Sequence, residues 1–394
     1  MRRVTQRALL LLLLLLLLTQ STACISAPLG NGSQATTSVT DPLPDLPNPL
    51  PPHLFPAWNT ADETARQFLS SPDGIVDVSV REYSYADLRE DLDLLAKLYP
   101  TRFSYRVFGQ SVAERDLYVA TLGNPNATKQ ILVSAGIHGR EYLTPLLVMK
   151  QIEYYLAYYD VGDYNGFRYS ALFDEYCFVI VPMTNPDGIM LAQEGIASIF
   201  SSSLRNKINT IYNQDRAAGY TKQTDINEYL KIWKANANGV DLNRNFAARW
   251  DEIDTGMSRP SHKNYKGTSP ASEPETRAMV TLTESLSNIK AVLCIHSQGE
   301  VLYWDCGQTG ELRTETEHFT EMLSIRDGYK VIYKQNNDAS YSDWCALEKG
   351  LIAVTVETGK SDEPGPLGIE QFPKIWTDNY DLFALATVNI KLHE

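Results

Sequence analysis

The chain has 394 residues, of which 43% are hydrophobic, so it is long enough and apolar enough to form a large globular core. Its formal charge at pH 7 is −13, with 48 acidic residues against 35 basic ones. Binding to a polyanion requires clustered lysine and arginine, and the sequence contains no basic stripe. We therefore expect no nucleic-acid partner.

The first 23 residues differ from the rest of the chain. Arginines precede an unbroken leucine run at 9–18, and small residues follow at 21–23. The run is too short to span a bilayer, and the pattern is typical of an export signal. Cys24 comes next, where bacterial lipoproteins, which this segment resembles, carry their lipid. The chain is thus predicted to be either a lipoprotein on the outer face of the cytoplasmic membrane or, after plain cleavage behind Ala23, a secreted protein.

Residues 24–78 are predicted to lead from the signal to the folded domain. Up to about residue 57 the composition is rich in Ser, Thr, Pro and Asn, which favours an extended tether over a packed element. A segment with no spacing role is an equal alternative. The predicted folded domain spans 79–394.

Within that domain helical and strand patterns alternate. Leucines at helical spacing predict a helix at 85–98, and further helices are expected at 145–159 and near 378–392. Residues 185–188 (Asn-Pro-Asp-Gly) indicate a turn, and 191–238 an insertion over one face. Short apolar runs predict strands at 117–122, 131–137, 176–183, 289–295 and 351–356. The alternation predicts a single α/β domain whose mixed, mostly parallel twisted sheet has helices on both faces.

Chemically capable side chains follow three of these strands. His138 and Glu141 follow the strand at 131–137, His296 follows the strand at 289–295, and Glu357 follows the strand at 351–356. Singly, each has an ordinary interpretation: His-x-x-Glu occurs by chance, and lone histidines and carboxylates commonly serve structure. Because ligands gather beyond the carboxyl ends of strands in open α/β sheets, we expect the four side chains to meet. Two histidines and one glutamate form a known catalytic zinc set, which leaves Glu357 as a free base.

A polar stretch at 239–246 adds Asp241, Asn243 and Arg244. An amide beside a guanidinium is suited to holding a carboxylate through paired hydrogen bonds. The alternative interpretation is an ordinary polar turn.

The cysteines of the domain show neither a CxxC pair nor a disulfide-dense spacing. Cys177 and Cys294 lie in apolar runs and are predicted to be buried thiols. Cys306 and Cys345 could pair, although nothing in the sequence requires it.

The order of these motifs is specific. From about Tyr83 to the C-terminus the chain resembles the zinc carboxypeptidase family of the carboxypeptidase A type. The motifs that carry the resemblance are 138–141, 185–188, 241–245, 296–297 and 354–357. The resemblance implies one Zn²⁺ per chain, bound by His138, Glu141 and His296, with a fourth position for water.

The resemblance also implies the remaining catalytic roles. Glu357 matches the general base, and Lys234 is the nearest match to an arginine that stabilises the oxyanion. Asp241 matches the carboxylate that orients the first zinc-binding histidine.

Substrate-binding roles are implied in the same way. Asn243 and Arg244 match the pair that holds a free carboxylate, and Arg140 matches a further arginine on the substrate side. Tyr333 matches the mobile substrate tyrosine of the family, with Tyr341 as its rival.

Within the family, segments 233–237, 296–304, 342–344 and 363–367 are similar to bacterial γ-D-glutamyl-meso-diaminopimelate peptidases, which cut peptidoglycan stem peptides. The expected partner is therefore a peptide, in particular a cell-wall stem peptide. Two alternatives stay open: a carboxypeptidase of ordinary L-peptides, and a non-catalytic peptide-binding lipoprotein of the same fold. The sequence does not indicate an oligomeric state.

Overall fold

The computed structural model describes residues 58–71, 74–361 and 365–394. The predicted signal, Cys24 and most of the predicted tether lie outside these residues. Within them, no helix combines the length and apolarity needed to cross a bilayer.

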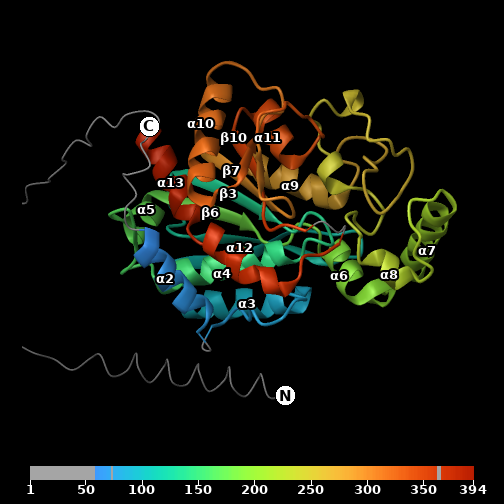
Figure 1. Ribbon diagram of the computed structural model, residues 1–394, viewed down its shortest axis with the longest axis horizontal. Coiled ribbons are helices and arrows are strands. Elements are labelled where there is room, and N and C mark those ends of the chain that lie inside the picture. The colour runs from blue at the N-terminus through green and yellow to red at the C-terminus, as the bar shows by residue number, and fades with distance from the viewer. Residues whose placement is uncertain (1–57, 72–73, 362–364) are drawn as a thin grey trace, which may run out of the picture. The chain divides into compact units, whose positions relative to one another are not determined.

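A sheet of eight strands, in the order β1-β2-β6-β3-β7-β10-β8-β9, forms the centre of the domain (Figure 1). Strands β6, β3, β7 and β10 are parallel and central, whereas β1, β2 and β8 each run antiparallel to a neighbour. The strands are β1 (Phe103–Gln110), β2 (Asp116–Leu122), β3 (Lys129–Ala135), β6 (Tyr176–Val181), β7 (Ile289–His296), β8 (Val301–Tyr303), β9 (Lys330–Ile332) and β10 (Ile352–Glu357), with a separate pair β4 (Asp163–Tyr164) and β5 (Phe167–Arg168).

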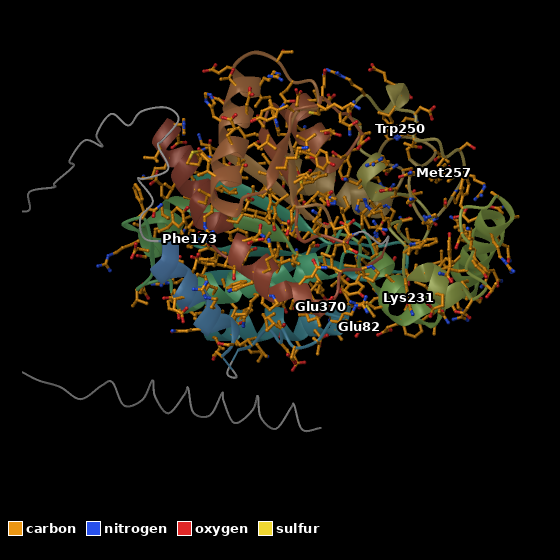
Figure 2. All side chains as sticks on the ribbon, viewed as in Figure 1. Glu82, Phe173, Lys231, Trp250, Met257 and Glu370 are labelled. Carbon is orange, nitrogen blue, oxygen red and sulfur yellow. The ribbon has the colours of Figure 1, made fainter. Side chains whose placement is uncertain are left out.

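Helices cover both faces of the sheet, as the sequence predicts. Successive residues of a strand point to opposite faces, so Ile131 and Val133 pack with α3, α4, α12 and α13, while Leu132 packs with α9 and α11. The α-helices outside the predicted insertion at 191–238 are α2 (Trp58–Leu69), α3 (Tyr85–Leu98), α4 (Leu143–Ala157), α5 (Tyr169–Glu175), α6 (Pro186–Glu194), α9 (Pro274–Ser285), α10 (Gly310–Asp327), α11 (Tyr341–Lys349), α12 (Phe372–Asn379) and α13 (Leu382–His393). Phe173, labelled in Figure 2, is one of the fully buried aromatic residues on α5. The expected single α/β domain is confirmed.

The packed region begins earlier than the predicted residue 79. Helix α2 carries the buried Ala65, whose carbonyl accepts a hydrogen bond from Trp376 Nε1 of α12 at 2.9 Å. Asp62 pairs with Arg326 of α10 at 2.7 Å. These contacts attach α2 to the domain, so residues 58–69, which fall in the predicted lead-in, are a helix of the domain.

Two local expectations also differ from the structure. The Asn-Pro-Asp-Gly motif at 185–188 is a helix start: Asn185 caps α6 by accepting from Gly188 N, and Pro186 occupies the first turn. Helix α4 begins at Leu143, ahead of Pro145. The described cysteines, Cys177 among them, are all buried free thiols, so the Cys306–Cys345 pair is not formed.

The predicted insertion has a small core of its own. Helices α7 (Ser202–Ala217) and α8 (Ile226–Leu230) pack around Ile208, Tyr229 and Trp233, apart from the sheet in Figure 1. A long, mostly irregular segment then leads to α9, and Figure 2 shows Trp250 and Met257 on it.

Beneath this insertion lies a buried acidic residue, Glu275 of α9. Its Oε1 accepts from Val112 N and its Oε2 from Asn236 Nδ2, both at 3.1 Å. Burial and the negative charge of Asp187 raise the pKa of Glu275 to about 8, although Asp187 itself pairs with Arg115 at 2.6 Å.

We predict that Glu275 makes the protein less stable as the pH rises. Between the ordinary carboxyl pKa of 4.5 and about 8, the folded state holds a proton that the unfolded state has lost. The free energy of unfolding should therefore fall by up to about 1.4 kcal/mol per pH unit in that window, and no further above it.

Denaturant unfolding between pH 5 and 9 checks this prediction. Glu275→Gln keeps an acceptor oxygen but cannot titrate, so its stability should vary less over the window. The exposed Glu252 gives a control, Glu252→Gln, which should keep the wild-type slope. An unchanged slope in Glu275→Gln contradicts the prediction.

Candidate active site

The strand order explains why distant parts of the chain meet. Strands β3, β7 and β10 are adjacent and parallel, so their carboxyl ends lie at one edge of the sheet. In the β7–β10 register His296 is paired directly with Glu357. His138 and Glu141 follow β3 on the neighbouring strand. The predicted convergence of these four side chains is therefore found.

His138, Glu141 and His296 form a compact buried cluster. One potential ligand atom from each lies within 4.8 Å of the others. His138 Nδ1 is 2.8 Å from Glu141 Oε1, and His296 Nδ1 is 3.2 Å from Glu141 Oε2. The side chains are 2–6% exposed, so water does not screen the carboxylate.

Asp241 fixes the orientation of His138. Its Oδ1 lies 3.2 Å from His138 Nε2, which leaves Nδ1 facing Glu141. Asp241 also accepts from the backbone N–H of Asn264 at 2.8 Å and of Asn243 at 3.2 Å. Burial alone would raise the pKa of Asp241, but the charges of His138 and Arg244 hold it well below its usual range.

The loop between the strand and Glu141 requires a glycine. A Cβ at Gly139 would lie 2.3 Å from the carbonyl oxygen of Gly188 and 2.8 Å from that of Trp233. Without it the loop hydrogen-bonds to the neighbouring segment: Gly139 N donates to Lys234 O at 3.2 Å, and Arg140 N donates to Trp233 O at 2.8 Å.

This pairing brings Lys234 to the cluster. Its Nζ lies 3.0 Å from Glu141 Oε1 and 3.4 Å from His138 Nδ1. Burial acts to raise the pKa of Glu141, yet the charges of His138 and Lys234 keep it well below its ordinary value. The opposite holds at Glu357, where burial raises the pKa, His296 opposes the rise and the charge of Glu141 adds to it. The site thus contains one carboxyl, Glu141, that is held as an anion and one, Glu357, whose pKa is raised.

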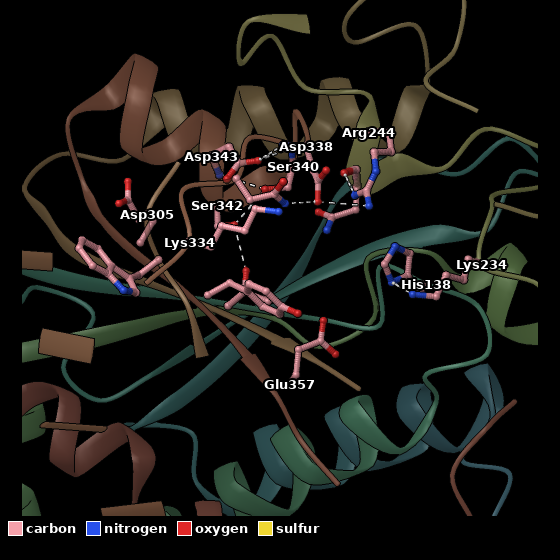
Figure 3. A pocket seen from close by; sticks show the side chains of 16 residues that line it. His138, Lys234, Arg244, Asp305, Lys334, Asp338, Ser340, Ser342, Asp343 and Glu357 are labelled. Atoms are coloured by element: carbon pink, nitrogen blue, oxygen red, sulfur yellow. Dashed lines mark hydrogen bonds and ion pairs between the residues drawn. The ribbon is translucent and has the colours of Figure 1, made fainter. Parts of the chain in front are cut away.

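A polar pocket of about 200 Å³ opens beside the cluster. Figure 3 shows His138 and Lys234 on one side of it, Glu357 on another, and Arg244 with Asp338 at the top of the view. Its lining residues are His138, Lys234, Asn243, Arg244, Tyr303, Trp304, Asp305, Lys334, Asn336, Asp338, Ser340, Ser342, Asp343, Ala353, Thr355 and Glu357.

Asn243 and Arg244 lie in this pocket, as predicted. They belong to a short 3-10 turn at 242–244, and Arg244 Nη1 donates to Asn243 O at 2.8 Å. Arg244 Nη2 is 3.3 Å from Asp338 Oδ2, and the Arg244 side chain is 21% exposed. The guanidinium is therefore held at the pocket wall and remains accessible to a carboxylate.

The structure does not bring the predicted tyrosine into the pocket. The hydroxyl of Tyr333 donates to Glu321 Oε1 at 2.8 Å, and the residue is 54% exposed. Its rival Tyr341 is buried, with its hydroxyl 2.6 Å from that of Thr283. The tyrosine that lines the pocket is Tyr303 of β8, which lies within the segment 296–304 of family resemblance.

Arg140 is also absent from the pocket lining. Its Nε is buried and has no hydrogen-bond partner among the described residues, and its charge lowers the pKa of the neighbouring Glu357. It lies close enough to act electrostatically, but the structure does not place it against the predicted substrate carboxylate.

The sequence motifs also missed most of the polar pocket wall. Asp305, Asp338 and Lys334 come from loops after β8 and β9. Ser342, whose hydroxyl is 3.0 Å from that of Thr355, was noted only within a segment of family resemblance. In the sequence, Tyr303 and Trp304, which follow His296, are the residues that could have indicated this wall.

The donor set fits zinc. Two imidazoles and one carboxylate converge, one imidazole is oriented by a further carboxylate, and the cluster is shielded from solvent. A buried anion also needs a positive charge nearby, and Lys234 meets that need only in part.

We predict that Asp241→Asn weakens zinc binding about 10- to 100-fold, because the amide loses the charge that fixes the ring orientation of His138. Competition for Zn²⁺ against a chromophoric chelator measures the effect. Asp251, an exposed acid, provides the control Asp251→Asn, which should bind zinc like the wild type. Wild-type affinity in Asp241→Asn would refute the orienting role.

Comparison with known proteins agrees with this chemistry. A family model described as zinc carboxypeptidase matches residues 88–381. Gamma-D-glutamyl-L-diamino acid endopeptidase 1 of Lysinibacillus sphaericus is 31% identical over 306 residues, covering 77% of this chain and 72% of that protein. Mast cell carboxypeptidase A of Homo sapiens is 28% identical over 245 residues, covering 60% of this chain and 51% of that protein.

Solved structures show the same fold. Thrombin activatable fibrinolysis inhibitor superposes with a TM-score of 0.61 at 19% identity, covering 84% of this chain and 80% of that chain. Carboxypeptidase A from Helicoverpa armigera gives 0.59 at 17% identity, with the same coverage of both chains. Since the family match spans most of the sequence and the cluster could hold the metal that the family uses, the chain belongs to the zinc carboxypeptidase family and is a zinc metallopeptidase.

Proposed function

We propose that this metallopeptidase hydrolyses the amide bond between γ-D-glutamate and diaminopimelate in peptidoglycan stem peptides. The observation that carries the proposal is the polar, charged wall of the pocket beside the His138–Glu141–His296 cluster. Diaminopimelate has a second amino group and a second carboxylate on its side chain. The pocket wall carries Lys334 and two carboxylates, Asp305 and Asp338, which pair with Arg313 and Arg244. Such a wall offers charged partners for both groups, which an apolar pocket does not.

The named bacterial relative supports the same assignment. The Lysinibacillus protein is called a gamma-D-glutamyl-L-diamino acid endopeptidase and aligns over 77% of this chain. We also propose that the chain is exported, because its leader has the pattern of an export signal and its substrate would lie outside the cytoplasm. Acylation of Cys24 would attach it to the membrane next to the wall.

The chain's own residues account for the proton transfers. His138, Glu141 and His296 would hold the zinc, which when bound polarises the scissile carbonyl and lowers the pKa of water. Glu357 takes a proton from the attacking water and gives it to the leaving nitrogen of diaminopimelate. Its place at the end of β10, paired in register with His296 and lining the pocket, suits both halves of this transfer.

Charge and position are supplied by three further residues. Lys234 Nζ, beside Glu141, lies where it can stabilise the negative charge that develops on the carbonyl oxygen. Asn243 and Arg244 bind a carboxylate of the leaving residue at the opposite wall. The substrate is thus held between a carboxylate clamp and the metal cluster.

Removal of C-terminal L-amino acids is the second candidate. The accessible guanidinium of Arg244 and the similarity to human mast cell carboxypeptidase A favour it. Both candidates use the same centre and differ in the residue that enters the pocket.

A substrate assay distinguishes them. Purified protein loaded with Zn²⁺ is incubated with L-Ala-γ-D-Glu-meso-diaminopimelate and, separately, with a panel of peptides ending in ordinary L-residues. We expect release of diaminopimelate and turnover of the panel at least about 100-fold slower, because an apolar side chain leaves the charged pocket unpaired. If any panel peptide is cleaved faster than L-Ala-γ-D-Glu-meso-diaminopimelate, the protein is an ordinary carboxypeptidase and the proposal is wrong.

Replacement of the base tests the mechanism. Glu357→Gln keeps the size of the side chain but cannot accept a proton, so kcat should fall at least about 100-fold. One zinc per chain should remain, since Glu357 is not a ligand. Elemental analysis and steady-state kinetics measure the two quantities, and wild-type kcat in Glu357→Gln is incompatible with its role as the base.

A further inference from the structure

Helix α7 of the insertion carries a buried carboxylate that the mechanism above does not use. Asp215 is 0% exposed and lies at the centre of a network of hydrogen-bond donors. Its carboxylate accepts from Tyr229 OH at 2.6 Å, from Ser261 Oγ at 2.6 Å and from Arg259 NH1 at 2.7 Å, and its Oδ2 lies 3.1 Å from His262 Nδ1. Such a network fixes the segment 259–262 against the insertion.

That segment in turn holds the backbone of Lys234. The carbonyl oxygen of His262 accepts from Lys234 N at 2.8 Å and from Ala235 N at 3.0 Å. The His262 ring also packs against Tyr229, at 5.5 Å between ring centroids, and Tyr229 packs against Trp233 at 5.8 Å.

Residues 233–235 are also hydrogen-bonded, on their other side, to the loop that carries His138. Gly139 N and Arg140 N donate to the carbonyl oxygens of Lys234 and Trp233. Residues 233–235 are therefore held between the loop that carries His138 and the segment that Asp215 fixes. The position of Lys234 Nζ depends on both attachments, because they fix the backbone point from which the flexible four-carbon side chain reaches Glu141.

We propose that Asp215 is a positioning residue for catalysis, acting through His262 to set Lys234 at the reacting carbonyl. The inference rests on the proposed catalytic role of Lys234 and extends it to a residue of the insertion. It assigns the insertion a function in the chemistry: α7 supplies the carboxylate that fixes one wall of the active site.

The chemistry of a carboxylate explains why aspartate suits this position. Its two oxygens accept from every donor in the network, and burial, which by itself raises the pKa of Asp215, is outweighed by these hydrogen bonds, so the pKa lies well below the usual range. An asparagine has one acceptor oxygen, and its N–H₂ group would face either Arg259, which donates to Oδ1, or Ser261 and Tyr229, which donate to Oδ2. Asp215→Asn should therefore displace the segment 259–262 while leaving the helix intact.

A double-mutant cycle tests the proposal. Steady-state kinetics are compared for the wild type, Asp215→Asn, Lys234→Ala and the double variant, with whichever peptide the wild type cleaves. We expect Asp215→Asn to lower kcat about 10- to 100-fold with KM changed less than about threefold, since displacements of about 1 Å have such costs. In the Lys234→Ala background the same substitution should cost less than about twofold. An equal loss of kcat in both backgrounds overturns the proposal, because a general structural defect would not depend on Lys234.

Hydrogen exchange supplies a readout that does not need activity. The amides of Lys234 and Ala235, which donate to His262, should exchange faster in Asp215→Asn, while peptides from the central strands and the zinc content stay as in the wild type. Unchanged exchange at 234–235 also overturns the proposal. If the wild type cleaved no peptide at all, the proposed function would fail, and this measurement would still decide whether Asp215 fixes the Lys234 backbone.

Two further variants complete the design. Ser201→Ala removes the N-cap of α7 at the end of that helix remote from Asp215 and takes no donor from the network, so it controls for general destabilisation and should keep wild-type kcat. Ser261→Ala removes one donor to Asp215 and is used in the same cycle if Asp215→Asn does not fold. It should show a smaller loss of kcat that again depends on Lys234, and a loss independent of Lys234 counts against the proposal.

Discussion

The buried carboxylate of Glu141 is the constraint on which the site depends. It lies among His138 Nδ1, His296 Nδ1 and Lys234 Nζ, all within 3.2 Å, and also accepts from Ser297 N. An isolated buried anion would be costly, so the fold must bring compensating groups to it from separate parts of the chain. The parallel order of β3, β7 and β10 does so, because it places their carboxyl ends side by side. Metal binding and catalysis both use the groups that this requirement collects.

The same requirement links the insertion to the sheet. Lys234 reaches Glu141 only because residues 233–235 are bonded to the glycine-containing loop on one side and to His262 on the other. Gly139 permits the first attachment, since a side chain there would collide with backbone oxygens. The second attachment passes through Asp215, a residue of α7 that contacts neither the metal cluster nor the pocket. A part of the chain that resembles a surface addition is therefore continuous with the active site through backbone hydrogen bonds.

The parts of the structure that could be predicted from the sequence are those with regular patterns of apolar residues. Strand ends carrying His138, His296 and Glu357 were recognisable because parallel strands align their ends and because apolar runs are easy to identify. The bounds of α3 were also predictable from its leucine spacing. Helix α2 was missed although its sequence is amphipathic, because it directly follows the proline-rich stretch. Irregular segments have no sequence periodicity from which contacts can be predicted. The sequence therefore indicated neither that Tyr333 lies outside the pocket nor that the segment 259–262 bonds to Asp215.

The pocket and the cluster impose different demands, and this difference bears on specificity. The cluster of His138, Glu141 and His296 works with one arrangement of charged groups, and the family resemblance was enough to predict it. The pocket wall is built largely from loops after β8 and β9, where Asp305 and Lys334 lie without periodic constraint. Loops can change charge without disturbing the sheet, so substrate preference can diverge while the metal-binding groups stay fixed. A polar wall around an unchanged centre is thus the feature that distinguishes a peptidase for a doubly charged residue from one that removes apolar residues.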